Sequence, residues 1–179
     1  MKINKYILKK EKESGLTLVE LLIAASVGLI CLAIIFVAYI GGVRSYELNE
    51  ERMKAIDRLW LNMNKIQREA RSGRQFMTPA SYEATYGVSI TPSEKPPLAF
   101  KLDDVKAVAF YTPEGSSDLY RASCDTVEIF APSVTISAAI DPASRFATVV
   151  LTTSWSYRGI IKEESISSQV SLRNWRTQW

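Results

Sequence analysis

The fold of this chain is decided by residues 15–43, GLTLVELLIAASVGLICLAIIFVAYIGGV, in which Glu20 is followed by 23 residues without a charged side chain. At about 1.5 Å per residue, an α-helix over residues 21–43 is about 34 Å long. The hydrocarbon layer of a bilayer is about 30 Å thick. The stretch therefore predicts a helix that crosses a membrane once.

Two ordinary export signals also combine basic residues with an apolar stretch. A secretory signal has an apolar core of about 7 to 15 residues followed by small residues at its cleavage site, whereas this run is longer and no such site follows it. A lipoprotein signal would use Cys31, but Ile30 precedes it where a small residue is expected, and the cysteine lies in mid-span. We therefore interpret residues 21–43 as a retained helix.

Glu20 is not explained by a plain membrane anchor. A carboxylate near the start of a membrane helix favours a cationic partner, because at the bilayer centre it costs about 2.5 to 3.5 kcal/mol. Alternatively, Glu20 stays among the lipid headgroups, where the positive end of the helix dipole stabilises it. Taken alone, the residue is compatible with both interpretations.

A short basic leader, Gly15, Leu16, Thr17-Leu18 and Glu20 stand directly before the apolar run. This arrangement resembles the type III signal of the type IV pilin superfamily. The resemblance implies cleavage after Gly15 by a prepilin peptidase, methylation of the new Leu16 amine, and use of the helix first as a membrane anchor and then as a filament core. It also implies that Glu20 pairs with the Leu16 amine of a neighbouring subunit. The other implied partners are major and minor pilins or pseudopilins and the inner-membrane assembly platform.

Chain length allows one domain beyond the membrane. We expect a leader over residues 1–15, a transmembrane or filament-core helix over 16–43, and a globular domain over 44–179. Five lysines and two glutamates lie in the leader, and removing them from the 22 basic and 19 acidic residues leaves 17 of each. The basic character is thus confined to the leader, and we expect no nucleic-acid partner.

Orientation is not decided by charge, because five lysines precede the span and four basic residues follow it closely. The resemblance implies a cytoplasmic leader and a periplasmic domain, that is, a single-pass inner-membrane protein that later enters a pilus or pseudopilus. With Cys31 in the span, Cys124 has no partner for a disulfide within the outer domain. Many pilins close a C-terminal loop with such a disulfide, and this chain departs from that pattern.

The helical pattern continues past the membrane into an amphipathic helix over residues 44–73. Ser72-Gly73 is a plausible stop, and basic residues before it suit the negative end of a helix. Residues 74–97 contain four prolines and lack periodicity, so we expect a connector with one short element near 81–86. The expected buried face of the helix consists of Ile56, Leu59, Met63, Ile66 and Ala70, with Trp60 beside them.

Strand-like segments fill the rest of the chain. The clearest alternation lies in residues 165–173, and the loop at residues 113–118 reads as the turn of a hairpin. We expect an α+β fold in which the long helix packs on one face of an antiparallel sheet over residues 98–174, as in pilins. The expected strands are residues 105–111, 119–122, 126–131, 135–140, 145–157 and 165–173.

Four short strings suggest a subgroup. They are Phe110-Tyr111, Leu119-Tyr120-Arg121, Val127-Glu128-Ile129-Phe130 and Val170-Ser171-Leu172-Arg173-Asn174. They resemble the W-type minor pilins of type IV pili and the J-type minor pseudopilins of type II secretion systems. Many major pilins have a proline in the second half of the apolar helix, and this chain has none from Leu16 to Thr78. We therefore expect a minor subunit, in few copies and near the filament tip.

Signals for catalysis are sparse. The chain has no histidine, which removes the commonest general base and most zinc sites. Ser116-Ser117 and Asp118 share a polar turn, and Cys124 has no histidine partner, so we expect no enzyme. The competing class is a single-span envelope enzyme or solute-binding domain.

Calcium is the one cofactor that we consider, because the resembling pseudopilins include some that bind it in C-terminal loops. Calcium prefers several oxygen ligands. The candidates by residue type are Asp103, Asp104, Asp118 and Asp125. Their spacing matches no known calcium loop, so we expect no metal and no other cofactor.

Overall fold

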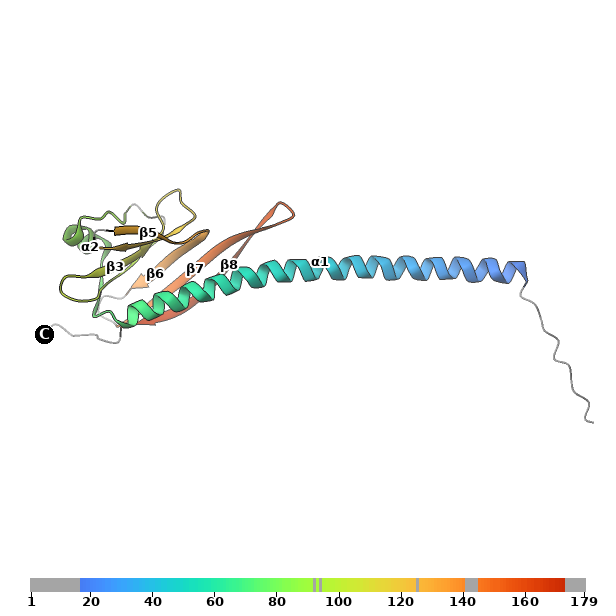
Figure 1. The fold of residues 1–179 in the computed structure, drawn as a ribbon, viewed down its shortest axis with the longest axis horizontal. Coiled ribbons are helices and arrows are strands. Elements are labelled where there is room, and N and C mark those ends of the chain that lie inside the picture. The colour runs from blue at the N-terminus through green and yellow to red at the C-terminus, as the bar shows by residue number, and fades with distance from the viewer. Residues whose placement is uncertain (1–16, 92, 94, 125, 141–144, 173–179) are drawn as a thin grey trace, which may run out of the picture. The chain divides into compact units, whose positions relative to one another are not determined.

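The structure is a computed structural model that describes residues 17–91, 93, 95–124, 126–140 and 145–172. It divides into two compact units, Met1–Tyr46 and Glu47–Trp179. The elements are α1 (Leu18–Arg71), β1 (Gln75–Met77), α2 (Pro79–Tyr86), β2 (Leu98–Lys101), β3 (Ala107–Tyr111), β4 (Leu119–Ser123), β5 (Thr126–Ala131), β6 (Val134–Ile140), β7 (Phe146–Tyr157) and β8 (Ile160–Ser171) (Figure 1). The α+β class with a long N-terminal helix is confirmed.

The described part of the first unit is the beginning of α1. The second unit starts at Glu47 and contains the rest of α1 and all the strands. In this unit the predicted buried face of the helix is confirmed at Leu59, Met63, Ile66 and Ala70, which are fully buried. Ile56 is half-buried and Trp60 is exposed. One row of side chains, at spacings of three and four, thus supplies the helix face of the core.

The second half of α1 ends where the chain must pass close to the core. The backbone N–H of Gly73 donates to the carbonyl of Ala70 at 2.8 Å. A Cβ at position 73 would lie 2.8 Å from Cδ2 of Leu172 and 3.0 Å from Cδ2 of Phe100. Only glycine fits this approach without moving its neighbours, which explains why residue 73, just past the end of the helix, is a glycine.

The strands form two antiparallel sheets, where we predicted one. The first has the order β1-β2-β3-β4-β5 and the second the order β6-β7-β8. Ser133 turns the chain from one sheet to the next: its N–H donates to Oδ1 of Asp118 at 2.7 Å, and its carbonyl accepts from the hydroxyl of Thr153 at 2.6 Å. At this corner Ser133 has φ 55° and both its backbone polar groups are held, and beyond it β6 pairs with β7.

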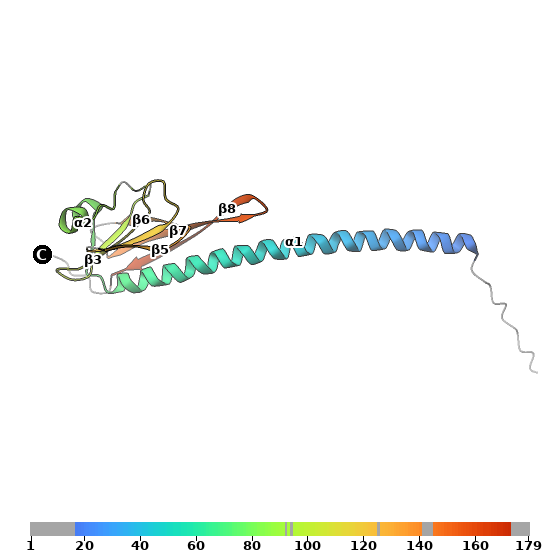
Figure 2. The same ribbon diagram turned by 45° about the horizontal axis from the view of Figure 1, so that its top comes forward.

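Both sheets and the helix nevertheless share one hydrophobic core. It contains Met63 from α1, Phe110 from β3, Ile136 from β6 and Leu151 from β7. In Figures 1 and 2 the C-terminal end of α1 runs beside β7 and β8. The predicted packing of helix against antiparallel sheet therefore holds, with two sheets in place of one.

Strand positions follow the predictions with four exceptions, of which the smallest is β3, which begins at Ala107, two residues later than predicted. The hairpin between β3 and β4 is confirmed, and β4 to β7 lie within a residue of their predicted ends. Our list of strands omitted β1 and β2, which have three and four residues and are too short to show alternation. The last strand begins at Ile160, five residues earlier than predicted, because the apolar pair Ile160-Ile161 interrupts the alternation.

Residues 74–97, which we expected to form a connector with one short element near residues 81–86, contain α2 at that place and, in addition, β1. Thr78 caps α2 by accepting the N–H of Ser81 at 3.3 Å. Tyr82 of α2 is fully buried in a second core on the other face of the five-stranded sheet. That core lies over alanines of β2, β3 and β4, whose small side chains allow the helix to approach closely. The sheet is thus covered on both faces.

A single carboxylate holds the segment after α2. Oε1 of Glu83 accepts the N–H groups of Ile90 and Thr91, both at 2.7 Å, and the hydroxyl of Thr91 at 2.6 Å. The Thr91 hydroxyl bond and then the Ile90 N–H bond lower the pKa of Glu83. An ionised Glu83 therefore fixes residues 89–91 against the helix.

Candidate functional site

The N-terminal end of α1 is the best candidate site. Gly15 and Leu16 lie outside the described residues, so the structure leaves their predicted roles open. The first described residue is Thr17, whose backbone N–H and hydroxyl each donate to Oε2 of Glu20 at 3.2 Å. The N–H of Glu20 in turn donates to Oγ1 of Thr17 at 3.3 Å. Thr17 and Glu20 thus form a reciprocal capping box at the start of the helix.

This geometry gives Glu20 a structural role. Its carboxylate satisfies an N–H in the first turn and lies at the positive end of the helix dipole. The sequence already held the signal, because Thr-x-x-Glu before an apolar run is the pattern of a capping box, and our sequence interpretation missed it. An ionised carboxylate has about four acceptor positions. The cap therefore leaves room for a further donor such as an amine.

The helix beyond Glu20 exposes an apolar surface. Leu21 is 61 % exposed, Leu32 64 % and Phe36 63 %. No residue of α1 before Ala55 is buried in the described structure. A soluble protein rarely exposes contiguous apolar surface of this extent, and where it occurs it marks contact with a membrane or another protein.

By length and composition, α1 contains a stretch able to cross a membrane. The hydroxyl of Ser26 donates to the carbonyl of Ile23 at 2.8 Å, so the polar group of this serine is satisfied within the helix. Helical hydrogen bonds satisfy the backbone of the same stretch, as a lipid environment requires. The exposed Cys31 is a free thiol in this stretch.

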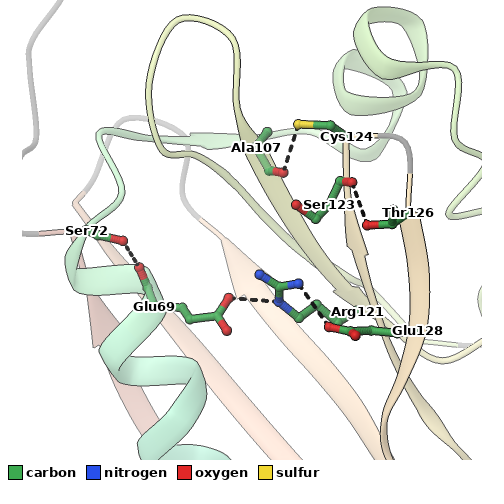
Figure 3. Close-up of polar contacts among 8 residues, drawn as sticks. All are labelled: Glu69, Ser72, Ala107, Arg121, Ser123, Cys124, Thr126 and Glu128. Carbon is green, nitrogen blue, oxygen red and sulfur yellow. Dashed lines mark hydrogen bonds and ion pairs between the residues drawn. The ribbon is translucent and has the colours of Figure 1, made fainter.

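Farther along the chain, an ion pair network ties α1 to the five-stranded sheet (Figure 3). Nε of Arg121 on β4 lies 3.0 Å from Oε2 of Glu69 on α1, and its Nη1 lies 3.0 Å from Oε1 of Glu128 on β5. Burial alone would lower the pKa of Arg121, but the bonds to Glu69 and Glu128 outweigh it and the pKa is raised. The sequence offered no signal for this contact, because 52 residues separate Glu69 from Arg121.

Three of the four acidic residues weighed for calcium lie in the described part of the chain, and each of the three has another partner there. Oδ1 of Asp103 accepts the N–H groups of Val105 and Lys106, which lower its pKa. Asp104 lies 3.7 Å from Nζ of Lys101, and Asp118 holds Ser133 as described above. Asp125 lies outside the described residues. Over the described part of the chain, no three His, Cys, Asp or Glu side chains gather as a metal site would require.

The two remaining candidates for chemistry are part of ordinary turns. The hydroxyl of Ser116 accepts the N–H of Asp118 at 3.1 Å, which closes the loop between β3 and β4. Sγ of Cys124 lies 3.7 Å from the carbonyl oxygen of Val105. It also lies 3.9 Å from the carbonyl oxygen of Ala107, the contact drawn in Figure 3. Each of these contacts stabilises a turn.

Comparison with known families finds the prokaryotic N-terminal methylation motif over residues 10–36. Comparisons with curated proteins and with solved structures gave no match. The matched segment contains the cleavage site predicted between Gly15 and Leu16, the Thr17 and Glu20 cap, and residues 21–36 of the apolar run. The chain thus carries a prepilin-type N-terminal motif ahead of an α+β domain with a long N-terminal helix, an arrangement similar to that of type IV pilins.

Proposed function

We propose that this chain is a structural subunit of a type IV pilin-like filament. The prepilin peptidase cuts it after Gly15, the new amine of Leu16 is methylated, and the apolar part of α1 anchors the product in the inner membrane with the domain from residue 44 onward in the periplasm. The N-terminal methylation motif over residues 10–36 carries this proposal. The exposed apolar surface that follows the motif on α1 supports it.

Assembly moves the apolar helix from lipid into a filament core. Apolar groups cover the helix both in lipid and in a filament core. The transfer therefore costs little free energy for side chains such as Leu32 and Phe36. The charged Glu20 is the exception, because it leaves the headgroup region. Pairing with the Leu16 amine of a neighbouring subunit compensates this charge, and the capping box holds the carboxylate at the helix end where that amine arrives.

Within this class we infer a minor subunit that primes a type IV pilus or lies at its tip, of the W-type. The alternative is a J-type minor pseudopilin of a type II secretion system. The proline-free stretch from Leu16 to Thr78 and the four short strings named in the sequence analysis support this subgroup. The protein works by binding and catalyses no reaction.

The proposal is tested by the chemistry of the mature N-terminus. Mass analysis of the protein purified from membranes should find a chain that starts at a methylated Leu16 and should find the precursor in cells that lack the prepilin peptidase. A chain that retains Met1 in peptidase-containing cells, or one cut after residue 43, would contradict the proposal. A deletion mutant assayed for surface pili and for secreted proteins then separates the pilus from the secretion system.

A further inference from the structure

The long hairpin of β7 and β8 ends in a tip that the proposed function leaves unexplained. We define the hairpin tip as residues 155–162, in which Tyr157 pairs with Ile160, Ser156 with Ile161, and Trp155 with Lys162. Ile160 is 62 % exposed and Ile161 is 74 % exposed. Two neighbouring isoleucines at this exposure are costly in water and call for a partner.

Contacts along α1 show which way the hairpin runs. Ser168 accepts from Nε2 of Gln67 at 2.8 Å, and Glu164 pairs with Arg52 at 2.7 Å. At the tip, the hydroxyl of Tyr157 donates to Oε2 of Glu47 at 3.4 Å, and Nη2 of Arg158 lies 3.4 Å from the same oxygen. The hairpin therefore follows the helix toward its N-terminal side, and its tip reaches the first residue of the second unit.

The position of Glu47 in the chain places the tip near a membrane boundary. Glu47 follows Val43, the last residue of the apolar run, by four residues, which correspond to about 6 Å of helix. If residues 21–43 lie in the bilayer, as the proposed function requires, lipid headgroups surround this part of the chain.

The side chains of the tip suit that layer. Trp155 and Tyr157 are residue types enriched where membrane meets water. Nζ of Lys162 lies 5.7 Å from the ring centroid of Trp155, and Cζ of Arg158 lies 5.4 Å from that of Tyr157. Residues 155–162 contain these two cations and no acidic residue. Of the acidic residues beside the tip, Glu47 pairs with Arg158, Glu164 pairs with Arg52, and Glu163 is exposed. Cations at this level are attracted to anionic lipids.

The geometry of the isoleucines distinguishes lipid from a flat protein partner. Successive residues of a strand point to opposite faces of the sheet, so Ile160 lies on the face of Tyr157 and Ile161 on the other. A partner packed on one face would leave one isoleucine in water. A layer that the tip enters end-on covers both.

We propose that the hairpin tip inserts into the phospholipid headgroup layer of the membrane that holds α1, as a second membrane contact of the unassembled subunit. This inference rests on the proposed function. Joining a filament would withdraw the tip from the lipid together with the apolar helix, so the contact belongs to the stored subunit before assembly.

The test uses the full chain in vesicles of phosphatidylethanolamine and phosphatidylglycerol. In a Cys31→Ser, Cys124→Ser background, an environment-sensitive fluorophore is attached at Ile161→Cys or, as the control, at Val105→Cys. Val105 is an equally exposed apolar residue, at 75 %, on the turn after β2. This turn lies beside the other end of the helix, because Asp104 is 3.9 Å from Arg74.

We expect blue-shifted emission and strong quenching by a headgroup nitroxide lipid at position 161, and neither at position 105. Adding Ile160→Ser and Lys162→Ser should return the emission at 161 toward that at 105. Equal emission at the two positions would overturn the proposal. A blue shift at position 161 that appears only as the protein density in the vesicles rises would also overturn it. In that case a second copy of the chain, and not lipid, would cover the hairpin tip. Flotation of the vesicles separates this outcome from failure of the proposed function, because a chain that does not float with lipid is not anchored by α1.

Discussion

The backbone N–H and the hydroxyl of Thr17 both donate to Oε2 of Glu20 at 3.2 Å, so the acidic residue of the N-terminal motif caps its own helix. This contact lies within one turn and does not depend on a neighbouring subunit. Removal of Glu20 would therefore change two properties together, the helix cap and the charge available to a neighbour's amine. Experiments on this residue need variants that separate the two.

Glu20→Gln and Glu20→Val provide that separation. Glutamine can fill the same position of a capping box, whereas valine cannot. Both variants remove the charge, and we expect both to be cut after Gly15 yet recovered in sheared filaments at a small fraction of the wild-type amount. Stranding a charged amine in a dry filament core costs about 3 to 5 kcal/mol. Wild-type incorporation of Glu20→Gln combined with loss of Glu20→Val would show that the cap, and not the charge, is required.

The Arg121 network should stabilise the domain mainly through Glu69. Arg121→Met removes the partner of a side chain that is only 32 % exposed. We expect the free energy of unfolding of the detergent-solubilised chain to fall by about 1.5 to 3 kcal/mol, the range for hydrogen bonds to charged groups.

Glu128→Gln is the control for Arg121→Met, because the side chain of Glu128 is 62 % exposed. It should cost at most about 1 kcal/mol, as surface ion pairs do. Denaturant unfolding of both variants gives the comparison. Equal losses would contradict the assignment of Glu69 as the main partner.

Glu83 should make the segment after α2 sensitive to acid. Its pKa in the folded protein lies below the usual 4.5 because of the bonds from Thr91 and Ile90. The stabilisation is therefore fully present above pH 4.5 and is lost as the pH falls through the lowered value. Wild-type protein should melt at a higher temperature than Glu83→Gln near neutral pH, and the difference should shrink below pH 4.5. A difference that stays constant across this range would count against the ionised form.

The proline-free helix and the missing domain disulfide predict a minor subunit. Quantitative mass spectrometry of purified filaments should find this chain in far fewer copies than the most abundant pilin. A comparable copy number would contradict the minor role and leave the pilin-like class intact.

The long helix was predicted from the sequence, and its capping box, which we missed, was equally readable there, because both depend on neighbours within one or two turns. An uncharged run from Leu21 to Val43 can be satisfied only as a helix in an apolar surrounding. Spacings of three and four predict that Leu59, Met63 and Ile66 belong to the core, and all three are fully buried. Most strands were predicted for the same reason, since alternation is a local property.

Tertiary structure alone decided how the strands divide and what the helix touches. Local alternation predicts that β5 and β6 are strands, but only the tertiary structure places them in different sheets, on either side of the corner at Ser133. The pairing of Glu69 with Arg121 and the arrival of the hairpin tip at Glu47 join residues 52 and 110 positions apart. Such contacts depend on the register of whole strands against the helix, which no short stretch of sequence encodes.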